Sequence, residues 1–185
     1  MTSDSSPVAL ITGAAKRIGA CLARSLHDAG YRVIIHYQTS ADAADALVAS
    51  LNESAPCSAV AVRANLCNLN DLTRLATQSV AEFGRMDVLV NNASSFFPTP
   101  VGDVNEDVWN NLTGSNVKGP LFLSQALHEE LALRGGQIIN IVDMHIDRPL
   151  PRHTVYCLAK SALASVTRSL ASELAPAIRV NGIAP

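Results

Sequence analysis

The chain has little excess charge and few cysteines. Its 185 residues carry 14 Lys and Arg against 16 Asp and Glu, a formal net charge of −2. Proteins that bind nucleic acid usually show a large basic excess, so no nucleic-acid partner is indicated. The four cysteines form no Cys-x-x-Cys pair and no cluster with zinc spacing, so we predict reduced thiols and no metal site. These cysteines are Cys21, Cys57, Cys67 and Cys157.

Export and membrane signals are also lacking. The first seven residues, Met1 to Pro7, are polar and no basic region precedes a long apolar run. No stretch approaches 18 uninterrupted apolar residues, so we expect no secretory signal, no membrane partner and a cytoplasmic location. Hydrophobic residues nevertheless make up 48% of the chain and charged residues 16%. This composition is typical of a packed globular protein, and the length favours one domain over residues 1–185.

Apolar, β-branched runs alternate along the chain with helical patterns. We predict strands at 8–12, 31–37, 58–64, 86–91, 137–142 and 178–183, and helices at 18–29, 41–53, 70–83, 105–134 and 154–174. Such alternation indicates βαβ units and a parallel sheet, and the nearly continuous apolar strands indicate helices on both faces. The fold class is therefore α/β, with a doubly wound parallel sheet. The irregular stretches 94–103 and 143–153 follow strand carboxyl ends, where such sheets bind ligands.

The first turn, Thr12-Gly-Ala-Ala-Lys-Arg-Ile-Gly19, connects a predicted strand to a predicted helix. Gly13 permits a tight turn and Gly19 permits close helix packing, so the N–H groups at the helix start can bind a pyrophosphate. The spacing departs from Gly-x-Gly-x-x-Gly, and the alternative is an ordinary βα turn that needs glycine. The context of strand, turn and helix favours the phosphate site.

The end of the second strand indicates which dinucleotide would bind. NAD-binding folds usually place a carboxylate there, bonded to the ribose 2′-hydroxyl. This chain has His36, Tyr37, Gln38, Thr39 and Ser40 instead, and no carboxylate before Asp42. Neutral donors, with the cation of Arg17 or Lys16, would accept a 2′-phosphate, so we predict NADPH as the cofactor. The alternative is that Lys16 and Arg17 are solvated surface charges.

Three motifs in order give the chain a family resemblance: the Gly13–Gly19 turn with Arg17, Asn91-Asn92-Ala93, and Tyr156-x-x-x-Lys160. With them the chain resembles the short-chain dehydrogenase/reductases over essentially its whole length, which implies a Rossmann-type fold. The resemblance implies cofactor contacts from Gly13, Lys16, Arg17, Ile18, Gly19, His36, Tyr37, Ser40, Asn65, Leu66, Asn92, Ala93, Ser94, Tyr156 and Lys160.

Several departures from the commonest family pattern narrow the resemblance. Arg17 stands where that pattern has glycine, and Asp143 stands where most members have serine. With His36-Tyr37, Ser40 and the run from Asn91 to Pro100, these residues resemble the pteridine reductases. The resemblance implies a substrate site of Arg17, Ser94, Phe96, Asp143 and Tyr156, in which Ser94 hydrogen-bonds a pterin and Phe96 covers its face. Phe96 and Phe97 could equally be buried loop anchors.

The catalytic candidates are Tyr156, Lys160, Asp143 and Asn116. Tyr156 and Lys160 are four apart and share one helix face, so we predict that the ammonium lowers the pKa of the phenol and makes it a proton donor. Asp143 could relay a proton with Tyr156, although it could instead be a turn residue, and Asp147 lies nearby. Asn116 resembles the family asparagine that binds a water linking the lysine to solvent; a local kink or a helix-packing hydrogen bond is the alternative.

These residues predict hydride transfer from NADPH to a dihydropterin of biopterin, monapterin or folate type. Two rivals are a short-chain reductase acting on a ketone or 3-oxoacyl thioester, and a non-catalytic NADP-binding sensor or scaffold. Family members continue beyond the position of Pro185 with a lid and a further strand, so we expect the C-terminal end to be incomplete. The resemblance also suggests a homotetramer built through helices 105–134 and 154–174.

Overall fold

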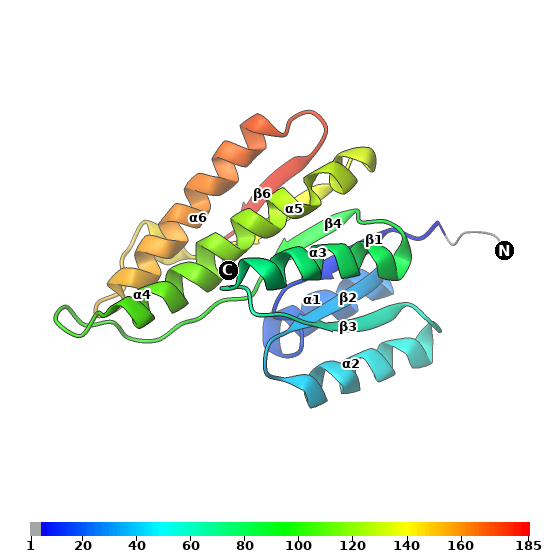
Figure 1. Ribbon diagram of the computed structural model, residues 1–185, viewed down its shortest axis with the longest axis horizontal. Coiled ribbons are helices and arrows are strands. Elements are labelled where there is room, and N and C mark those ends of the chain that lie inside the picture. Colours follow the sequence, from blue (N-terminus) through cyan, green and yellow to red (C-terminus); the bar gives the residue numbers. More distant parts are fainter. Residues whose placement is uncertain (1–4) are drawn as a thin grey trace.

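The structure is a computed structural model that describes residues 5–185. Residues 1–4, on which part of the signal-peptide prediction rests, lie outside the described residues. A six-stranded parallel sheet has the order β3-β2-β1-β4-β5-β6. Its strands are β1 (Val8–Ile11), β2 (Arg32–Tyr37), β3 (Ala59–Arg63), β4 (Val88–Asn91), β5 (Gln137–Ile141) and β6 (Arg179–Ile183). The predicted doubly wound α/β fold of Rossmann type is confirmed (Figure 1).

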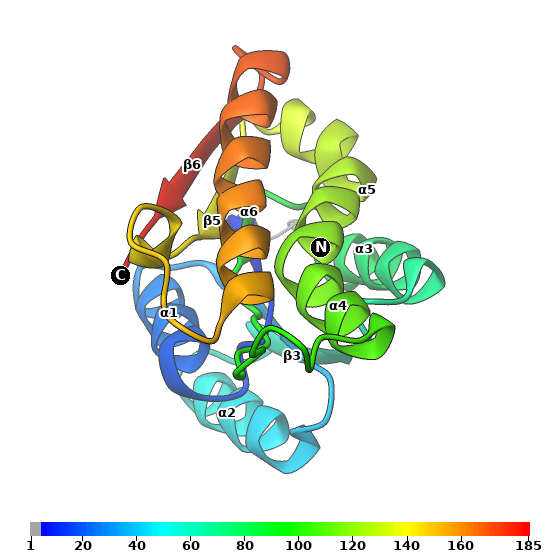
Figure 2. The same cartoon turned by 90° about the vertical axis from the view of Figure 1, so that its left-hand side faces the viewer.

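Helices cover both faces of the sheet (Figure 2). One core cluster combines Leu10 and Leu89 of the sheet with Leu75 of α3 (Leu69–Phe83) and Leu127 of α5 (Gly119–Leu133). The other combines Ile35 with residues of α1 (Arg17–Asp28) and α2 (Ala41–Ser54). These apolar side chains are fully or almost fully buried, and their removal from water stabilises the layers. The final helix, α6 (Thr154–Glu173), packs against β5 and β6.

The predicted bounds agree with the structure to within two residues, except for the long helix at 105–134. That segment consists of α4 (Glu106–Thr113), the π-helix η1 (Gly114–Lys118) and α5. Two glycines allow the π-helix to lie close to the loop after β3. A Cβ atom on Gly114 would lie 2.6 Å from the Cys67 sulfur, and one on Gly119 would lie 3.1 Å from Leu66. A short 3₁₀ turn, η2 (Met144–Ile146), also follows β5.

A buried hydrogen-bond network connects β4, β5 and α6. The Asn91 amide donates to Asn140 Oδ1 at 2.8 Å, and the Asn140 amide donates to Thr167 Oγ1 at 2.9 Å. Since burying unpaired amides is costly, this chain of bonds fixes the carboxyl ends of β4 and β5 relative to α6. Among residues 5–185, no helix is both long and apolar enough to cross a bilayer.

Candidate active site

The turn after β1 is held in shape by two close contacts. Gly13 has φ +63°, and a Cβ on it would lie 2.9 Å from Ala93 Cα. A Cβ on Gly19 would lie 2.4 Å from the Gly13 carbonyl oxygen. Side chains are therefore excluded at both positions, and α1 begins immediately beside β4. Lys16 does not cap α1 with its side chain, so the first N–H groups of the helix have no side-chain cap and can bind a phosphate.

Asn92 and Thr12 attach this turn to the end of β4. The Asn92 amide donates to the carbonyl oxygens of Thr12 at 2.8 Å and Gly13 at 3.2 Å. Thr12 Oγ1 accepts from the backbone N–H groups of Asn92 and Ala93, both at 3.0 Å. The Asn-Asn-Ala segment thus has a structural role that the motif alone did not reveal: Asn91 joins strands and Asn92 fixes the cofactor turn.

His36 lies beneath the same turn and is 2% exposed. Its Nδ1 accepts from the Gly13 N–H at 3.0 Å, so Nε2 carries the proton and donates to the Ala64 carbonyl at 3.2 Å. Burial lowers the pKa of His36 to about 4, against smaller opposing effects from Ala64 and Asp71. The ring is therefore neutral, and both nitrogens are used by the backbone. His36 supports the turn rather than offering the free donor to a 2′-phosphate that the sequence suggested.

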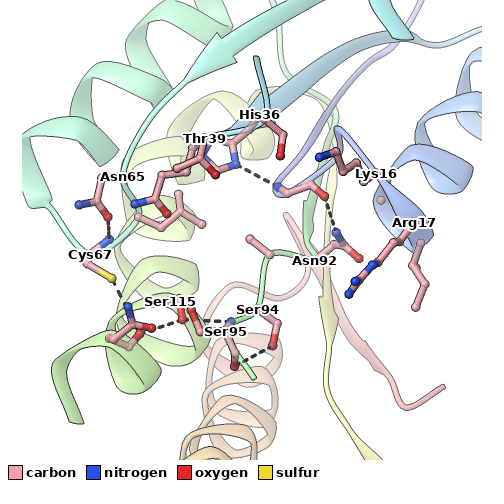
Figure 3. Close-up of a pocket in the computed structure, with 18 of the residues that line it drawn as sticks. Lys16, Arg17, His36, Thr39, Asn65, Cys67, Asn92, Ser94, Ser95 and Ser115 are labelled. Carbon is pink, nitrogen blue, oxygen red and sulfur yellow. Dashed lines mark hydrogen bonds between the residues drawn. The ribbon is translucent and has the colours of Figure 1, made fainter. Parts of the chain in front are cut away.

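A cleft of about 680 Å³ extends from this turn across the carboxyl ends of the strands (Figure 3). Lys16 and Arg17 lie at one side of it, and Ser94 and Ser95 line it near the π-helix. Twelve of the predicted cofactor residues line the cleft: Gly13, Lys16, Arg17, Ile18, Gly19, His36, Ser40, Asn65, Leu66, Asn92, Ala93 and Ser94. Its size and place suit an extended dinucleotide.

Three predicted cofactor residues do not line this cleft. The Tyr37 ring is half-buried and packs against the core cluster of α1 and α2, while Tyr156 and Lys160 lie on α6. Six further lining residues were not predicted from the sequence, and they come from the loops after β3 and β4, from α4 and from η1. They are Cys67, Ser95, Asp107, Asn110, Asn111 and Ser115; Gln38 and Thr39, which were considered for the 2′-phosphate, line the cleft as well. The residues of α4 carry no motif, so only the three-dimensional fold could have revealed them.

Three of the four predicted catalytic side chains, those of Asp143, Tyr156 and Lys160, gather where β5 meets α6. Tyr156 Oη donates to Asp143 Oδ2 at 2.5 Å, and Lys160 Nζ donates to the Ile141 carbonyl at 2.8 Å. Lys160 Nζ lies 5.8 Å from the centre of the Tyr156 ring. Asp143 is fixed in turn by the His145 N–H at 2.8 Å. Asp147, the competing carboxylate, ends the η2 turn and forms no such contact with Tyr156.

The predicted lowering of the Tyr156 pKa is wrong for this structure. Burial raises the pKa of the phenol well above its ordinary value, and the hydrogen bond to the Asp143 carboxylate raises it further. Although burial favours the neutral acid at Asp143, hydrogen bonds from Tyr156 and His145 hold the pKa of Asp143 below its ordinary value. Burial lowers the pKa of Lys160 to about 8. The proton therefore resides on the phenol, facing an ionised carboxylate.

Asn116 is fully buried within the π-helix. Its Oδ1 accepts from the Ser94 hydroxyl at 2.7 Å, and its amide donates to the carbonyls of Ser95 and Leu112, both at 3.0 Å. The asparagine thus connects the loop after β4 to the helix. Both the kink and the packing hydrogen bonds that were considered from the sequence occur here.

The two neighbouring phenylalanines have different surroundings. Phe97 packs against the buried cluster of Leu112, Val155, Tyr156 and Cys157 and anchors the loop. Phe96 is 56% exposed; its ring stacks on His153 at 4.7 Å and meets the Tyr156 ring edge-on at 4.8 Å. Phe96 is therefore the aromatic face beside the Tyr156–Asp143 pair. No group of three potential metal-ligating side chains gathers anywhere in residues 5–185.

Comparisons with known proteins agree with this arrangement. The family described as short chain dehydrogenase matches residues 7–185. "Pteridine reductase 1" of Leishmania tarentolae is 41% identical over 223 aligned positions, which cover 100% of this chain and 77% of that protein. An uncharacterised oxidoreductase of Methylorubrum extorquens is 38% identical, with 96% and 71% covered. A 3-oxoacyl-[acyl-carrier-protein] reductase of Synechocystis is 33% identical, with 100% and 75% covered.

Proposed function

Because this chain belongs to the short-chain dehydrogenase family, it is an oxidoreductase that uses a nicotinamide cofactor and a small-molecule substrate, and we propose that it is an NADPH-dependent pteridine reductase. The observation that carries the proposal is the hydrogen bond from Tyr156 to Asp143 beside the exposed ring of Phe96. A carboxylate bonded to the phenol, next to a flat apolar face, suits a planar heterocycle with a ring nitrogen to be protonated.

The residues present fit the cofactor. The uncapped start of α1 and the side chains of Lys16 and Arg17 supply donors and positive charge for a pyrophosphate. No carboxylate follows β2 before Asp42, which leaves room for a 2′-phosphate. When bound, the reduced nicotinamide supplies a hydride to a C=N carbon of the dihydropterin.

The chain's own groups then deliver the proton. Tyr156 donates its phenolic proton to the adjacent ring nitrogen as the carbon receives the hydride, so one C–H and one N–H bond form. The charge left on the phenolate is balanced by the Lys160 ammonium near the ring. Asp143 is only partly buried, so it can take up a solvent proton and return it to Tyr156. Phe96 and Ser94 orient the pterin for this transfer.

The proposal is tested by mixing the protein with NADPH and a panel of dihydropterins and following the nicotinamide absorbance. We expect oxidation of NADPH that is lost in Tyr156→Phe, a change that keeps the ring and removes the phenolic hydroxyl together with its proton. A parallel panel of ketones and 3-oxoacyl thioesters separates the rival supported by the Synechocystis relative. Turnover of the carbonyl panel but of no pterin would reject the substrate class.

A further inference from the structure

A second recess opens beside the main cleft. It has a volume of about 350 Å³ and is lined by Gln38, Thr39, Arg63, Ala64, Asn65, Asp71 and Arg74. Gln38, Thr39 and Asn65 line the main cleft as well, so the two spaces are adjacent. A ligand in the main cleft can therefore extend a substituent into this recess.

The recess lies at the carboxyl ends of β2 and β3. Tyr37, the last residue of β2, is paired in register with Arg63, the last residue of β3. In doubly wound folds the adenine ribose of a dinucleotide binds at the end of the second strand. The recess is thus next to the position where the ribose 2′-oxygen is expected.

Arg63 directs its guanidinium toward this position. Its Nε donates to the Gln38 carbonyl at 3.1 Å, which places the group against the loop after β2. Throughout residues 5–185, no carboxylate forms an ion pair with Arg63, so its two terminal nitrogens remain available for a bidentate contact with phosphate.

The other charges of the recess largely neutralise one another. Arg74 pairs with Asp71 at 3.0 Å, and Asp71 also accepts the Asn65 N–H at 2.7 Å. That hydrogen bond, followed by the one from Arg74, lowers the pKa of Asp71, so the carboxylate is ionised at neutral pH. Asp71 also interacts electrostatically with Arg63, and the two arginines and one aspartate together leave the recess with one net positive charge.

Lys16 and Arg17, the two cations that the sequence suggested, line the main cleft but not the recess. Arg17 lies across the main cleft from Thr39 (Figure 3). His36 is neutral and uses both ring nitrogens on the backbone. The hydroxyl of Ser40, at the start of α2, does not cap its helix and can add a hydrogen bond.

We propose that Arg63 binds the 2′-phosphate of NADPH and determines the preference for NADPH over NADH. The inference rests on the proposed function, because it assumes that the main cleft takes NADPH. Arg63 would then supply from β3 the positive charge that the loop Gln38-Thr39-Ser40 lacks.

Binding measurements on the protein without substrate test the inference. NADPH and NADH are titrated against wild type, Arg63→Gln and Arg63→Lys, with nicotinamide fluorescence as the readout. We expect Arg63→Gln to weaken NADPH binding by about tenfold or more, because a charge-assisted bidentate contact is lost, and to leave NADH binding unchanged. Arg63→Lys should retain part of the affinity. Arg134→Gln is the matched control, since Arg134 pairs with Glu130 at the other end of the strands.

A second variant, Thr39→Asp, places a negative charge at the recess from an exposed position. Thr39→Asp should weaken NADPH binding and leave NADH binding unchanged. It tests the inference even if the melting temperature of Arg63→Gln shows that the arginine variant folds poorly. Equal NADPH affinity in wild type and Arg63→Gln, or an equal loss for both cofactors, would overturn the role of Arg63 alone. A wild type that does not prefer NADPH would instead overturn the proposed cofactor and this inference with it.

Discussion

At the scale of single residues, the contact most important for chemistry is the hydrogen bond from Tyr156 to Asp143. A phenol that faces an ionised carboxylate keeps its proton, because the phenolate would be repelled by the neighbouring charge. In the proposed reduction, the phenol therefore holds the proton that is to be donated. The carboxylate also fixes the orientation of the phenol beside Phe96.

Replacing Asp143 with Asn should lower the pKa of Tyr156, because the negative charge disappears while burial remains. We expect tyrosine ionisation, followed by ultraviolet absorbance, to begin at lower pH in Asp143→Asn than in wild type. The Tyr156→Phe variant identifies the signal of this residue among the three tyrosines. Dihydropterin reduction should fall by about a hundredfold, the usual loss when proton delivery is disturbed. Identical tyrosine titrations would contradict this account.

The residue types of this site could be predicted from the sequence, but not the direction of their electrostatics. The four-residue spacing correctly places Tyr156 and Lys160 on one face of α6. It does not reveal that the ammonium bonds to the Ile141 carbonyl instead of the phenol, or that the carboxylate lies closer to Tyr156 Oη. The same holds for His36, because its burial under the Gly13 turn depends on contacts between β1 and β2.

At the scale of secondary-structure elements, the position of the cofactor turn depends on how closely α1 approaches β4. The Gly19→Ala substitution would place a Cβ 2.4 Å from a backbone oxygen and 2.7 Å from the Asn92 amide. Moving either the Gly13 carbonyl or the Asn92 side-chain amide would break hydrogen bonds between Asn92 and the turn. We expect a loss of about 1–3 kcal/mol in the free energy of unfolding, typical of overpacking, together with weaker cofactor binding.

Gly182→Ala is the control for that substitution. Gly182 lies in β6, and a Cβ there would meet only ordinary contacts at 3.6 Å or more. Urea denaturation and NADPH titration of both variants provide the comparison. Equal stability and equal binding in the two alanine variants would show that the close approach of α1 to β4 has no energetic importance.

The π-helix shows why one element could not be predicted correctly. The segment 105–134 has helical periodicity, and each of its parts is helical, but the pattern does not reveal the wider turn at 114–118. That turn exists because Asn116 bonds to a loop more than twenty residues earlier, and because Gly114 and Gly119 approach the loop after β3. Contacts between distant segments determine it, and periodicity reports only local preference.

Asn116→Ala tests whether the π-helix positions the loop after β4, which contains Ser94 and Ser95. The change removes the side-chain donor from the buried carbonyl of Leu112 and the partly buried carbonyl of Ser95, and it removes the shorter of the two acceptors of the Ser94 hydroxyl. We expect a destabilisation of about 1–3 kcal/mol from the unpaired groups. If Ser94 also orients the pterin, KM for the dihydropterin should rise more than the binding constant for NADPH. An equal change in KM for the dihydropterin and in the binding constant for NADPH would favour a purely structural role for Asn116.

At the scale of the whole molecule, the fold could be predicted because local and global signals agree. Each apolar run is long enough for a buried strand, each helix has a clear beginning or end, and parallel pairing follows from the alternation. The carboxyl ends of the three neighbouring strands β1, β4 and β5 then bring the turn, the Asn-Asn-Ala loop and Asp143 to one edge of the sheet. Arg63 was not among the cofactor residues predicted from the sequence, because no motif predicts which polar residue faces the recess.

Stability of the whole molecule should depend on pH through His36. The pKa of His36 is about 4 in the folded protein, below the ordinary value of 6.5, so between these values the unfolded chain binds a proton that the folded chain does not. Stability is therefore complete above pH ~6.5 and is lost as the pH falls toward about 4, by up to ~3 kcal/mol. His36→Asn keeps an acceptor for the Gly13 N–H but does not titrate.

Urea denaturation of wild type and His36→Asn at several pH values measures this contribution. Carboxylates with a lowered pKa, such as Asp143, are present in both proteins. The stability that they lose as the pH falls therefore cancels when the unfolding free energies of the two proteins are subtracted. We expect the advantage of wild type to be largest near neutral pH and to shrink steadily between pH 6.5 and about 4. His128→Asn, at an exposed position, should show no such convergence. A constant difference across that range would mean that the buried imidazole is not held neutral by the fold.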